Sequence, residues 1–439
     1  MDARRSAGIV LMVGAGLAMT TGFIPLSLAQ PIRAADHPPA AAQGDASRRA
    51  VEDLRYRLRN RGLDGIAARG FAAVPLTRDD ATEATSLLAT AQRHEMLEHL
   101  GGVVGQPESP RIQEGLIRIH GRTMRYWYAV RGHKPPAGRS LFISLHGGGG
   151  APPTVNTAQW ENQKRLYAPE EGVYFVPRAP GDTWDLWHQG HVDEFFDRVI
   201  RMLVVLEEVD PDRVFLLGYS AGGDGVYQVA PRMADRFAAA AMMAGHPNET
   251  RPDGLRNLPF AIWVGADDSG YERNAIAKKW GDSLAALAAG DPGGYRHDIR
   301  LVPGKGHWMD REDAAAISWL ASHTRDLRPD RVVWLQDDVP HKRMYWLAVS
   351  EPRPRARLDV SRSGQRITIA EDSPQGSLAI RLDDAMLDLN AQVVVIQGDK
   401  EVFRDVPLRT IGTLAKTLSE RGDPGGMFSA EIAIPLPDS

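Results

Sequence analysis

The sequence predicts an α/β fold built on a doubly wound, mostly parallel sheet, with a helical N-terminal segment and a small C-terminal β-domain. Between residues 113 and 327, short apolar runs alternate with amphipathic stretches, as expected when helices connect parallel strands. One of these runs ends abruptly in a Gly-x-Ser-x-Gly turn. From residue 328 the pattern changes to short β-branched runs separated by turn residues.

Composition limits the function classes. The chain has 439 residues, which suggests two or three domains. Its contents of 43% hydrophobic and 25% charged residues are those of a globular protein, and a net charge of −4 gives no electrostatic basis for nucleic-acid binding. The absence of cysteine excludes disulfides, thiolate nucleophiles and cysteine-ligated metals.

Residues 1–29 have the pattern of a signal peptide. Arg4 and Arg5 precede an apolar run over residues 7–28, and Ser27-Leu28-Ala29 supplies a small-x-small cleavage pattern. A retained membrane anchor is the alternative, because the apolar run is nearly long enough to span a bilayer. Its glycines and Pro25 favour cleavage. We therefore expect an exported protein, periplasmic or extracellular, with no membrane span after cleavage.

Two regions precede the α/β domain. Residues 30–49 are rich in alanine, proline and small polar residues and predict a disordered leader. Residues 50–112 predict a helical segment, with one helix over 50–61 and a second over 77–100. Neither helix carries a chemical motif.

The α/β domain, predicted over residues 113–327, begins with a strand pair joined at Gly121. A buried strand over 139–145 then ends at His146 and four glycines. Glycines in this position let the backbone turn its amides towards an oxyanion, which makes Gly147 or Gly148 a candidate donor. A flexible linker is the alternative, although linkers rarely follow a buried strand directly.

A long aromatic loop follows the next strand, over residues 173–176. Loops at the carboxyl ends of parallel strands line the site in open α/β sheets. Trp184, Trp187 and His188 of this loop either form an aromatic wall beside the substrate or fix the loop onto the core. An amphipathic helix over 192–208 leads to the next strand.

The Gly-x-Ser-x-Gly turn spans Gly218 to Gly222 and follows the apolar run Val214–Leu217. This pattern is typical of a strand that turns sharply into a helix and projects a serine hydroxyl outward. The flanking glycines permit close backbone packing. Ser220 is therefore a candidate nucleophile, and the amide of Ala221 is a candidate oxyanion donor.

Three later strands, predicted over 238–243, 260–264 and 298–302, end near further polar residues. The first leads to His246, the second to Asp267 and Asp268, and the third to His307. A helix over 275–289 lies between the last two strands. Asp310 is expected to cap a final helix that runs through Leu320, with Asp313 at the capping-box position.

Serine, acid and histidine thus follow three different strands, and their order along the chain is that of the α/β-hydrolases. A serine hydroxyl needs an adjacent base, an imidazole can take and return its proton, and a carboxylate holds the imidazole tautomer. The order predicts a serine hydrolase in which Ser220 is the nucleophile and His307 the base. From spacing alone, Asp267 and Asp268 are both candidates for the acid.

The segments LHGGGG, GYSAGGDG, AGHPN, VGADD and GKGHW resemble secreted bacterial α/β-hydrolases related to polyhydroxybutyrate depolymerases and feruloyl or acetylxylan esterases. The resemblance covers residues 116–324. It implies ester hydrolysis through an acyl-enzyme, without metal or organic cofactor, and it implies Asp268 as the acid. The chain departs from these relatives in lacking cysteine and in carrying Asp224 in the elbow helix, where a carboxylate either alters substrate charge preference or favours the helix N-terminus.

The C-terminal residues 328–439 predict a small β-sandwich or half-barrel, with a hairpin turn at Gln397-Gly398-Asp399-Lys400. We expect this domain to pack against the hydrolase rather than to bind a polymer independently.

Our prediction is an exported serine ester hydrolase whose partner is a small or polymeric ester. A peptidase on the same fold and a non-catalytic binding protein are the alternatives, and the sequence leaves the oligomeric state open. The residues that we predict to contact the substrate are His146, Trp184, Trp187, His188, Tyr219, Asp224 and His246.

Overall fold

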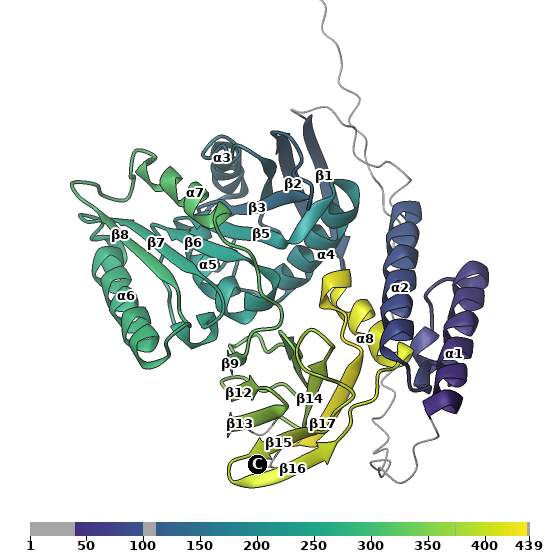
Figure 1. Ribbon diagram of the computed structural model, residues 1–439. Coiled ribbons are helices and arrows are strands. Elements are labelled where there is room, and N and C mark those ends of the chain that lie inside the picture. Colours follow the sequence, from purple (N-terminus) through teal and green to yellow (C-terminus); the bar gives the residue numbers. More distant parts are fainter. Residues whose placement is uncertain (1–39, 100–110, 374, 437–439) are drawn as a thin grey trace, which may run out of the picture.

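A computed structural model describes residues 40–99, 111–373 and 375–436. It contains an eight-stranded sheet of order β1-β2-β4-β3-β5-β6-β7-β8, which Figure 1 shows across the upper half of the molecule. Strands β3 to β8 run parallel, whereas β1 and β2 form an antiparallel hairpin at one edge. This arrangement is the α/β-hydrolase fold that the sequence predicts.

The strands of this sheet are β1 (Arg111–Ile119), β2 (Arg122–Arg131), β3 (Arg139–Leu145), β4 (Gly172–Arg178), β5 (Val209–Tyr219), β6 (Ala239–Met243), β7 (Phe260–Gly265) and β8 (His297–Val302). Its helices are α3 (Pro153–Gln163), α4 (His191–Leu206), α5 (Ala221–Arg232), α6 (Arg273–Gly290) and α7 (Ala316–Ala321). Short 3-10 helices are η4 (Ala234–Arg236), η5 (Pro252–Leu255), η6 (Gly270–Glu272) and η7 (Glu312–Ala315).

The sheet is covered on both faces because successive side chains of its strands point to opposite sides. Leu141 and Ile143 of β3 belong to a core shared with α4, α5 and α6, whereas Phe142 belongs to a second core shared with α3 and α7. All of β3 is buried, including the polar Arg139, Ser140 and Ser144 that flank its apolar residues. The carboxyl ends of the parallel strands are therefore held rigidly at one edge.

The last helix of this domain differs from the prediction. Asp310 and Arg311 both adopt positive φ angles, of 51° and 67°, so the chain cannot continue into an α-helix there. Instead, η7 precedes the short α7, and Asp310 pairs with Lys305 rather than capping a helix. Asp313 is fully buried and accepts a hydrogen bond from the Tyr167 hydroxyl, so the predicted capping box does not form.

The N-terminal helices are α1 (Ala40–Arg61) and α2 (Arg78–His99), with η2 (Ile66–Ala68) and η3 (Gly70–Ala73) between them. Helix α1 begins ten residues before the predicted start at residue 50, so residues 40–49 are helical rather than a disordered leader. The predicted signal peptide, residues 1–29, lies outside the described residues. Within the described ranges, every helix is too short or too polar to cross a membrane.

The C-terminal region forms two sheets, of orders β10-β11-β14-β17 and β16-β15-β13-β12-β9. Their buried apolar residues belong to the same hydrophobic core as those of α4, α5 and α6. The predicted hairpin turn connects β15 to β16. The strands are β9 (Arg331–Leu335), β10 (Arg343–Met344), β11 (Leu347–Val349), β12 (Arg357–Ser363), β13 (Arg366–Asp372), β14 (Ser377–Leu382), β15 (Val393–Gln397), β16 (Lys400–Asp405) and β17 (Ala430–Pro435).

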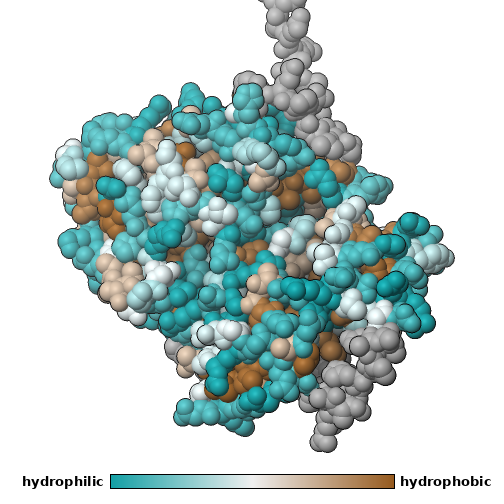
Figure 2. Space-filling model, viewed as in Figure 1, coloured by the Kyte–Doolittle hydropathy of each residue, from teal (hydrophilic) through white to brown (hydrophobic). Residues whose placement is uncertain are grey.

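The sequence analysis missed one helix, α8 (Ile411–Arg421), which packs against the N-terminal helices α1 and α2. The 3-10 helix η8 (Pro424–Gly426) follows it. Ile411, Leu414 and Leu418 of α8 share a core with α1 and α2. Figure 1 shows α8 between the N-terminal helices and the β-domain. The face shown in Figure 2 is largely hydrophilic, with apolar residues in separate small groups, because the apolar stripes of these elements face one another.

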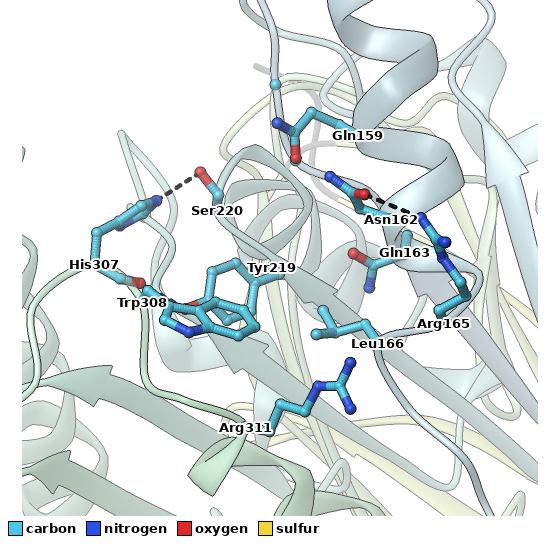
Figure 3. A pocket seen from close by; sticks show the side chains of 12 residues that line it. Gln159, Asn162, Gln163, Arg165, Leu166, Tyr219, Ser220, His307, Trp308 and Arg311 are labelled. Carbon is cyan, nitrogen blue, oxygen red and sulfur yellow. Dashed lines mark hydrogen bonds between the residues drawn. The ribbon is translucent and has the colours of Figure 1, made fainter.

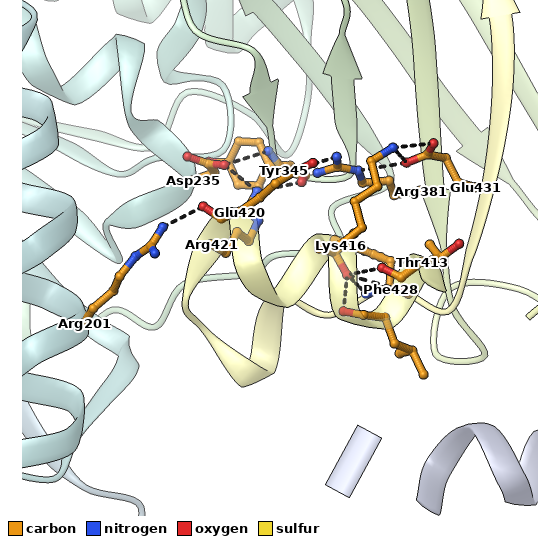
Figure 4. A network of polar contacts seen from close by, with 12 residues as sticks. Arg201, Asp235, Tyr345, Arg381, Thr413, Lys416, Glu420, Arg421, Phe428 and Glu431 are labelled. Atoms are coloured by element: carbon orange, nitrogen blue, oxygen red, sulfur yellow. Dashed lines mark hydrogen bonds and ion pairs between the residues drawn. The ribbon is translucent and has the colours of Figure 1, made fainter. Parts of the chain in front are cut away.

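Polar contacts connect the α/β domain to the β-domain. Two are buried ion pairs, Asp235 with Arg421 and Arg325 with Asp423. The half-buried contacts are the ion pair of Asp197 with Arg343 and the hydrogen bond between Asp193 and His341. Figure 4 shows Arg421 of α8 directed at Asp235, which also accepts a hydrogen bond from the Tyr345 amide. Burial lowers the pKa of Arg421 to about 10, against the opposing effect of Asp235.

We predict that Asp235→Asn strongly destabilises the protein, because it leaves the fully buried Arg421 guanidinium without its carboxylate. Removing one partner of a buried pair typically costs about 3–5 kcal/mol. The matched control is Asp282→Asn, which removes an exposed pair with Lys278 on α6 and is expected to change little. Urea unfolding monitored by circular dichroism measures both. Equal midpoints for the two variants would contradict a structural role for the Asp235–Arg421 pair.

Candidate active site

Ser220 lies at the turn between β5 and α5 with a φ of 59° and a ψ of −125°, a conformation that non-glycine residues rarely adopt. Close packing holds it there. A Cβ on Gly218 would lie 2.2 Å from the carbonyl oxygen of Gly222, and a Cβ on Gly222 would lie 2.1 Å from that of Leu145. Only glycine fits at both positions, so the sequence pattern reflects a steric requirement of the turn.

The hydroxyl of Ser220 contacts a histidine that contacts a carboxylate. His307 Nε2 lies 3.0 Å from Ser220 Oγ, and His307 Nδ1 lies 2.8 Å from Asp268 Oδ2. Asp268 is buried, whereas Asp267 is exposed and has no hydrogen bond to His307 among the described residues. The structure therefore brings together Ser220, His307 and Asp268 from the ends of β5, β8 and β7.

Two residues at the start of α6 position Asp268, and the sequence analysis missed both. Arg273 Nη1 lies 3.6 Å from Asp268 Oδ1, and the amide of Asn274 donates to the Asp268 carbonyl at 3.1 Å. Asn274 also donates from Nδ2 to the carbonyl of Ala266 at 2.8 Å. Their place just after the Asp-Asp turn is the only signal that the sequence offers.

His146 fixes the glycine loop rather than contacting substrate, which corrects its predicted place in the substrate site. It is fully buried, donates from Nδ1 to the Gly147 carbonyl at 2.6 Å, and accepts at Nε2 from the Ala179 amide at 3.1 Å. Burial lowers the pKa of His146 to about 3, so the ring is neutral and its tautomer is set by these two bonds. The Asn156 side chain holds the same loop by accepting from the Gly149 amide at 2.9 Å.

Backbone amides lie beside the Ser220 hydroxyl. A Cβ on Gly147 would lie 3.1 Å from Ser220 Cβ, so this loop passes directly over the serine. Within the described residues, the amides of Gly147, Gly148 and Ala221 donate to no protein acceptor. Ala221 begins α5, where the first amides of a helix have no partner within the helix. Amides without a protein acceptor next to a nucleophile are what an oxyanion site requires, so Gly147, Gly148 and Ala221 stay candidates for that site.

The two tryptophans of the aromatic loop have different environments. Trp187 is fully buried, donates from its indole to the His146 carbonyl at 3.0 Å, and packs against Phe196 of α4. It therefore fixes the loop and is not part of a substrate wall, because no substrate can reach it. Trp184 is 65% exposed beside Gly150 and contacts the ring of His188, so both remain candidates for substrate contact.

Tyr219 supports the histidine loop. Its hydroxyl donates to the His307 carbonyl at 2.5 Å and accepts from the Met309 amide at 3.2 Å, while its ring lines the pocket. Asp224 supports another loop, because its Oδ1 accepts from the His246 amide at 2.6 Å. Burial raises the pKa of Asp224 to about 6. Asp224 and His246 do not line the pocket at Ser220, and neither do Trp184 and His188, so contact of these four residues with substrate stays a prediction.

A cavity of about 690 Å³ opens beside Ser220 and His307 (Figure 3). One wall comes from α3 and the segment after it, which the sequence analysis did not connect with the site. The other wall comes from the segment after His307. The lining residues that the sequence analysis missed are Gln159, Asn162, Gln163, Arg165, Leu166, Trp308 and Arg311.

One group of potential cation ligands occurs within the described ranges. Glu249, Asp337 and Asp338 place carboxylate oxygens within 4.8 Å of one another. Arg355 already pairs with Asp337 at 3.0 Å and with Asp338 at 2.7 Å. Because a guanidinium neutralises two of the three carboxylates, we assign no metal to this group.

Comparison with known proteins confirms the resemblance inferred from the sequence. The chain is 32% identical over 150 residues to a putative esterase, NocK, of Nocardia uniformis subsp. tsuyamanensis, covering 31% of this chain and 44% of the relative. It is 24% identical over 193 residues to a poly(3-hydroxybutyrate) depolymerase of Ralstonia pickettii, covering 37% and 39%. The chain thus spans less than half the length of either curated relative. No family model matches it.

Solved structures with similar folds include a thermostable esterase, at a TM-score of 0.40 and 18% identity, covering 49% of this chain and 63% of that one. Another is the poly(3-hydroxybutyrate) depolymerase LpqC of Bordetella parapertussis, at a TM-score of 0.39 and 17% identity, covering 53% and 95%. The fold assignment rests on the sheet order and the elbow described above.

We predict that Trp187→Ala lowers stability while leaving the relative rates for different esters nearly unchanged. Replacing a buried tryptophan with alanine typically costs about 3–5 kcal/mol. Trp184→Ala is the matched control, because its exposed ring contributes little to the core. Melting temperatures and relative rates across esters of varied bulk test this. A change in selectivity without a loss of stability in Trp187→Ala would restore the substrate-wall interpretation.

Proposed function

We propose that this protein is a serine hydrolase that cleaves carboxylic esters through an acyl-enzyme. The observation that carries the proposal is the continuous contact from Ser220 Oγ to His307 Nε2, at 3.0 Å, and from His307 Nδ1 to Asp268 Oδ2, at 2.8 Å. The separations are those expected of an activated nucleophile, its base and the group that orients the base.

In the first half of the reaction, His307 Nε2 accepts the Ser220 proton as Oγ attacks the ester carbonyl carbon. The negative charge that forms on the carbonyl oxygen is stabilised by the amides of Ala221 and of Gly147 or Gly148. His307 then gives the proton to the leaving alkoxide, which departs as the alcohol. Ser220 is left acylated.

In the second half, His307 takes a proton from water, the resulting hydroxide attacks the acyl carbon, and the same amides stabilise the new oxyanion. Return of the proton to Ser220 Oγ releases the carboxylic acid. Asp268 accepts from His307 Nδ1 throughout and stabilises the imidazolium. The nucleophile, the base, the orienting carboxylate and the oxyanion donors of both halves are all groups of this chain.

The names of the two curated relatives, an esterase and a depolymerase, favour an ester over a peptide as substrate. The complete set of hydrogen-bonded groups at Ser220 favours catalysis over a purely binding role. We propose in addition that residues 1–29 direct export and are removed, since their sequence has the pattern of a signal peptide. We place the hydrolase domain at residues 113–327 and the β-domain at residues 328–439, with the helices α1 and α2 before them.

We predict that Ser220→Ala reduces ester turnover by several orders of magnitude and leaves the fold intact. The reason is that, in the part of the chain that the structure describes, Ser220 supplies the only hydroxyl that contacts His307 Nε2. Turnover of phenyl acetate and far-ultraviolet circular dichroism measure the two effects. Near-normal turnover by the purified variant would refute the nucleophile assignment.

The acid is tested by a matched pair of neighbouring substitutions. Asp268→Asn is expected to lower kcat by a factor on the order of 10⁴, because an amide at this position favours the wrong tautomer of His307. Asp267→Asn serves as the control, since Asp267 is exposed and it is Asp268 that contacts His307 Nδ1. An equal or larger loss in Asp267→Asn would reverse the assignment.

A further inference from the structure

Two arginines line the pocket that opens at Ser220. Arg165 lies just after α3, and Arg311 lies just before η7. In Figure 3 their guanidinium groups lie on either side of Leu166, away from His307. The described lining residues include no aspartate or glutamate, so the wall of this pocket carries net positive charge.

Neither guanidinium group is neutralised by an ion pair within the part of the chain that the structure describes. The guanidinium group of Arg165 makes one long hydrogen bond, 3.5 Å from Nη2 to Asn162 Oδ1. Glu161, on the same helix as Asn162, pairs instead with Lys164 at 2.9 Å. The positive charge of Arg165 is therefore available to a ligand.

The carboxylates around Arg311 are likewise engaged elsewhere. Asp310 and Glu312, its two neighbours, pair with Lys305 at 2.8 Å and 3.2 Å. Asp313 interacts with Arg311 electrostatically but is fully buried and accepts a hydrogen bond from Tyr167. Arg311 thus lines the pocket, and none of the described carboxylates forms an ion pair with it.

We propose that the pocket selects esters that carry a carboxylate, which Arg165 and Arg311 bind. This inference rests on the proposed function, because it assigns the substrate class of the same site. Guanidinium groups bind carboxylates through paired N–H donors. Leu166 and the rings of Tyr219 and Trp308 line the same cavity and contact the carbon chain between the ester and the carboxylate. The substrate is thus a half-ester of a dicarboxylic acid or an ester of a hydroxy acid with a free carboxylate.

The test uses two pairs of esters that differ only in charge. In the first, the charge is on the acyl part: the monophenyl ester of glutaric acid against the phenyl ester of glutaramic acid. In the second, it is on the alcohol part: the acetate ester of hydroxybutanoate against that of hydroxybutanamide. The amide cap matches the carboxylate in size and is not itself an ester. The measured quantity is the ratio of kcat/KM for the anionic ester to that for the neutral one.

In one of the two pairs, the wild-type ratio is expected to favour the anionic ester on the order of tenfold, as for two partly exposed ion pairs. Higher ionic strength lowers the preference, because salt screens exposed charges. Arg165→Gln and Arg311→Gln each reduce the ratio, and the double variant brings it near unity. Arg59→Gln, an exposed arginine on α1, is the matched control and keeps the wild-type ratio.

A wild-type ratio near unity in both pairs, or a preference that survives in the double variant, would overturn the carboxylate site. In either case hydrolysis of the neutral esters would leave the proposed function standing. If the wild-type protein hydrolyses none of the four esters, both the proposed function and this inference are overturned.

Discussion

The constraint on which this molecule depends is the strained turn at Ser220. Its positive φ is maintained because β5, α5 and the end of β3 approach one another so closely that a side chain at Gly218 or Gly222 would collide with backbone. Strain of this kind costs about 1–3 kcal/mol and persists only where the surroundings enforce it. The fully buried strand β3 and the cores on both faces of the sheet supply that enforcement.

The loop opposite the serine is held by an equally rigid set of contacts. His146, neutral because it is buried, bonds both to its own loop and to the segment after β4, and Trp187 bonds to the carbonyl of His146. His146 and Trp187, which the sequence analysis placed beside the substrate, thus support the glycine loop instead. Their effect on substrate is indirect, through the position of the Gly147 amide.

Much of the fold was predictable because the local signals agree with one another. The segment over 139–145 has Leu141, Phe142 and Ile143 at its centre and becomes the buried strand β3, and the Gly-x-Ser-x-Gly pattern reports the elbow directly. The role of Trp187 was not predictable, since burial depends on which loop covers it. Asp313 fits a capping box by spacing, but tertiary contact with Tyr167 overrides that local preference. Arg165 and Arg311 have no motif and are brought together only by the fold.

The central claim is that Ser220 is an activated nucleophile. The most direct measurement is reaction of the purified protein with a fluorophosphonate, followed by mass spectrometry of the intact chain and of its peptides. The account predicts one covalent adduct, on the peptide that contains Ser220, and loss of the adduct when His307 is replaced by asparagine. An adduct on a different residue, or no reaction at all, would contradict it.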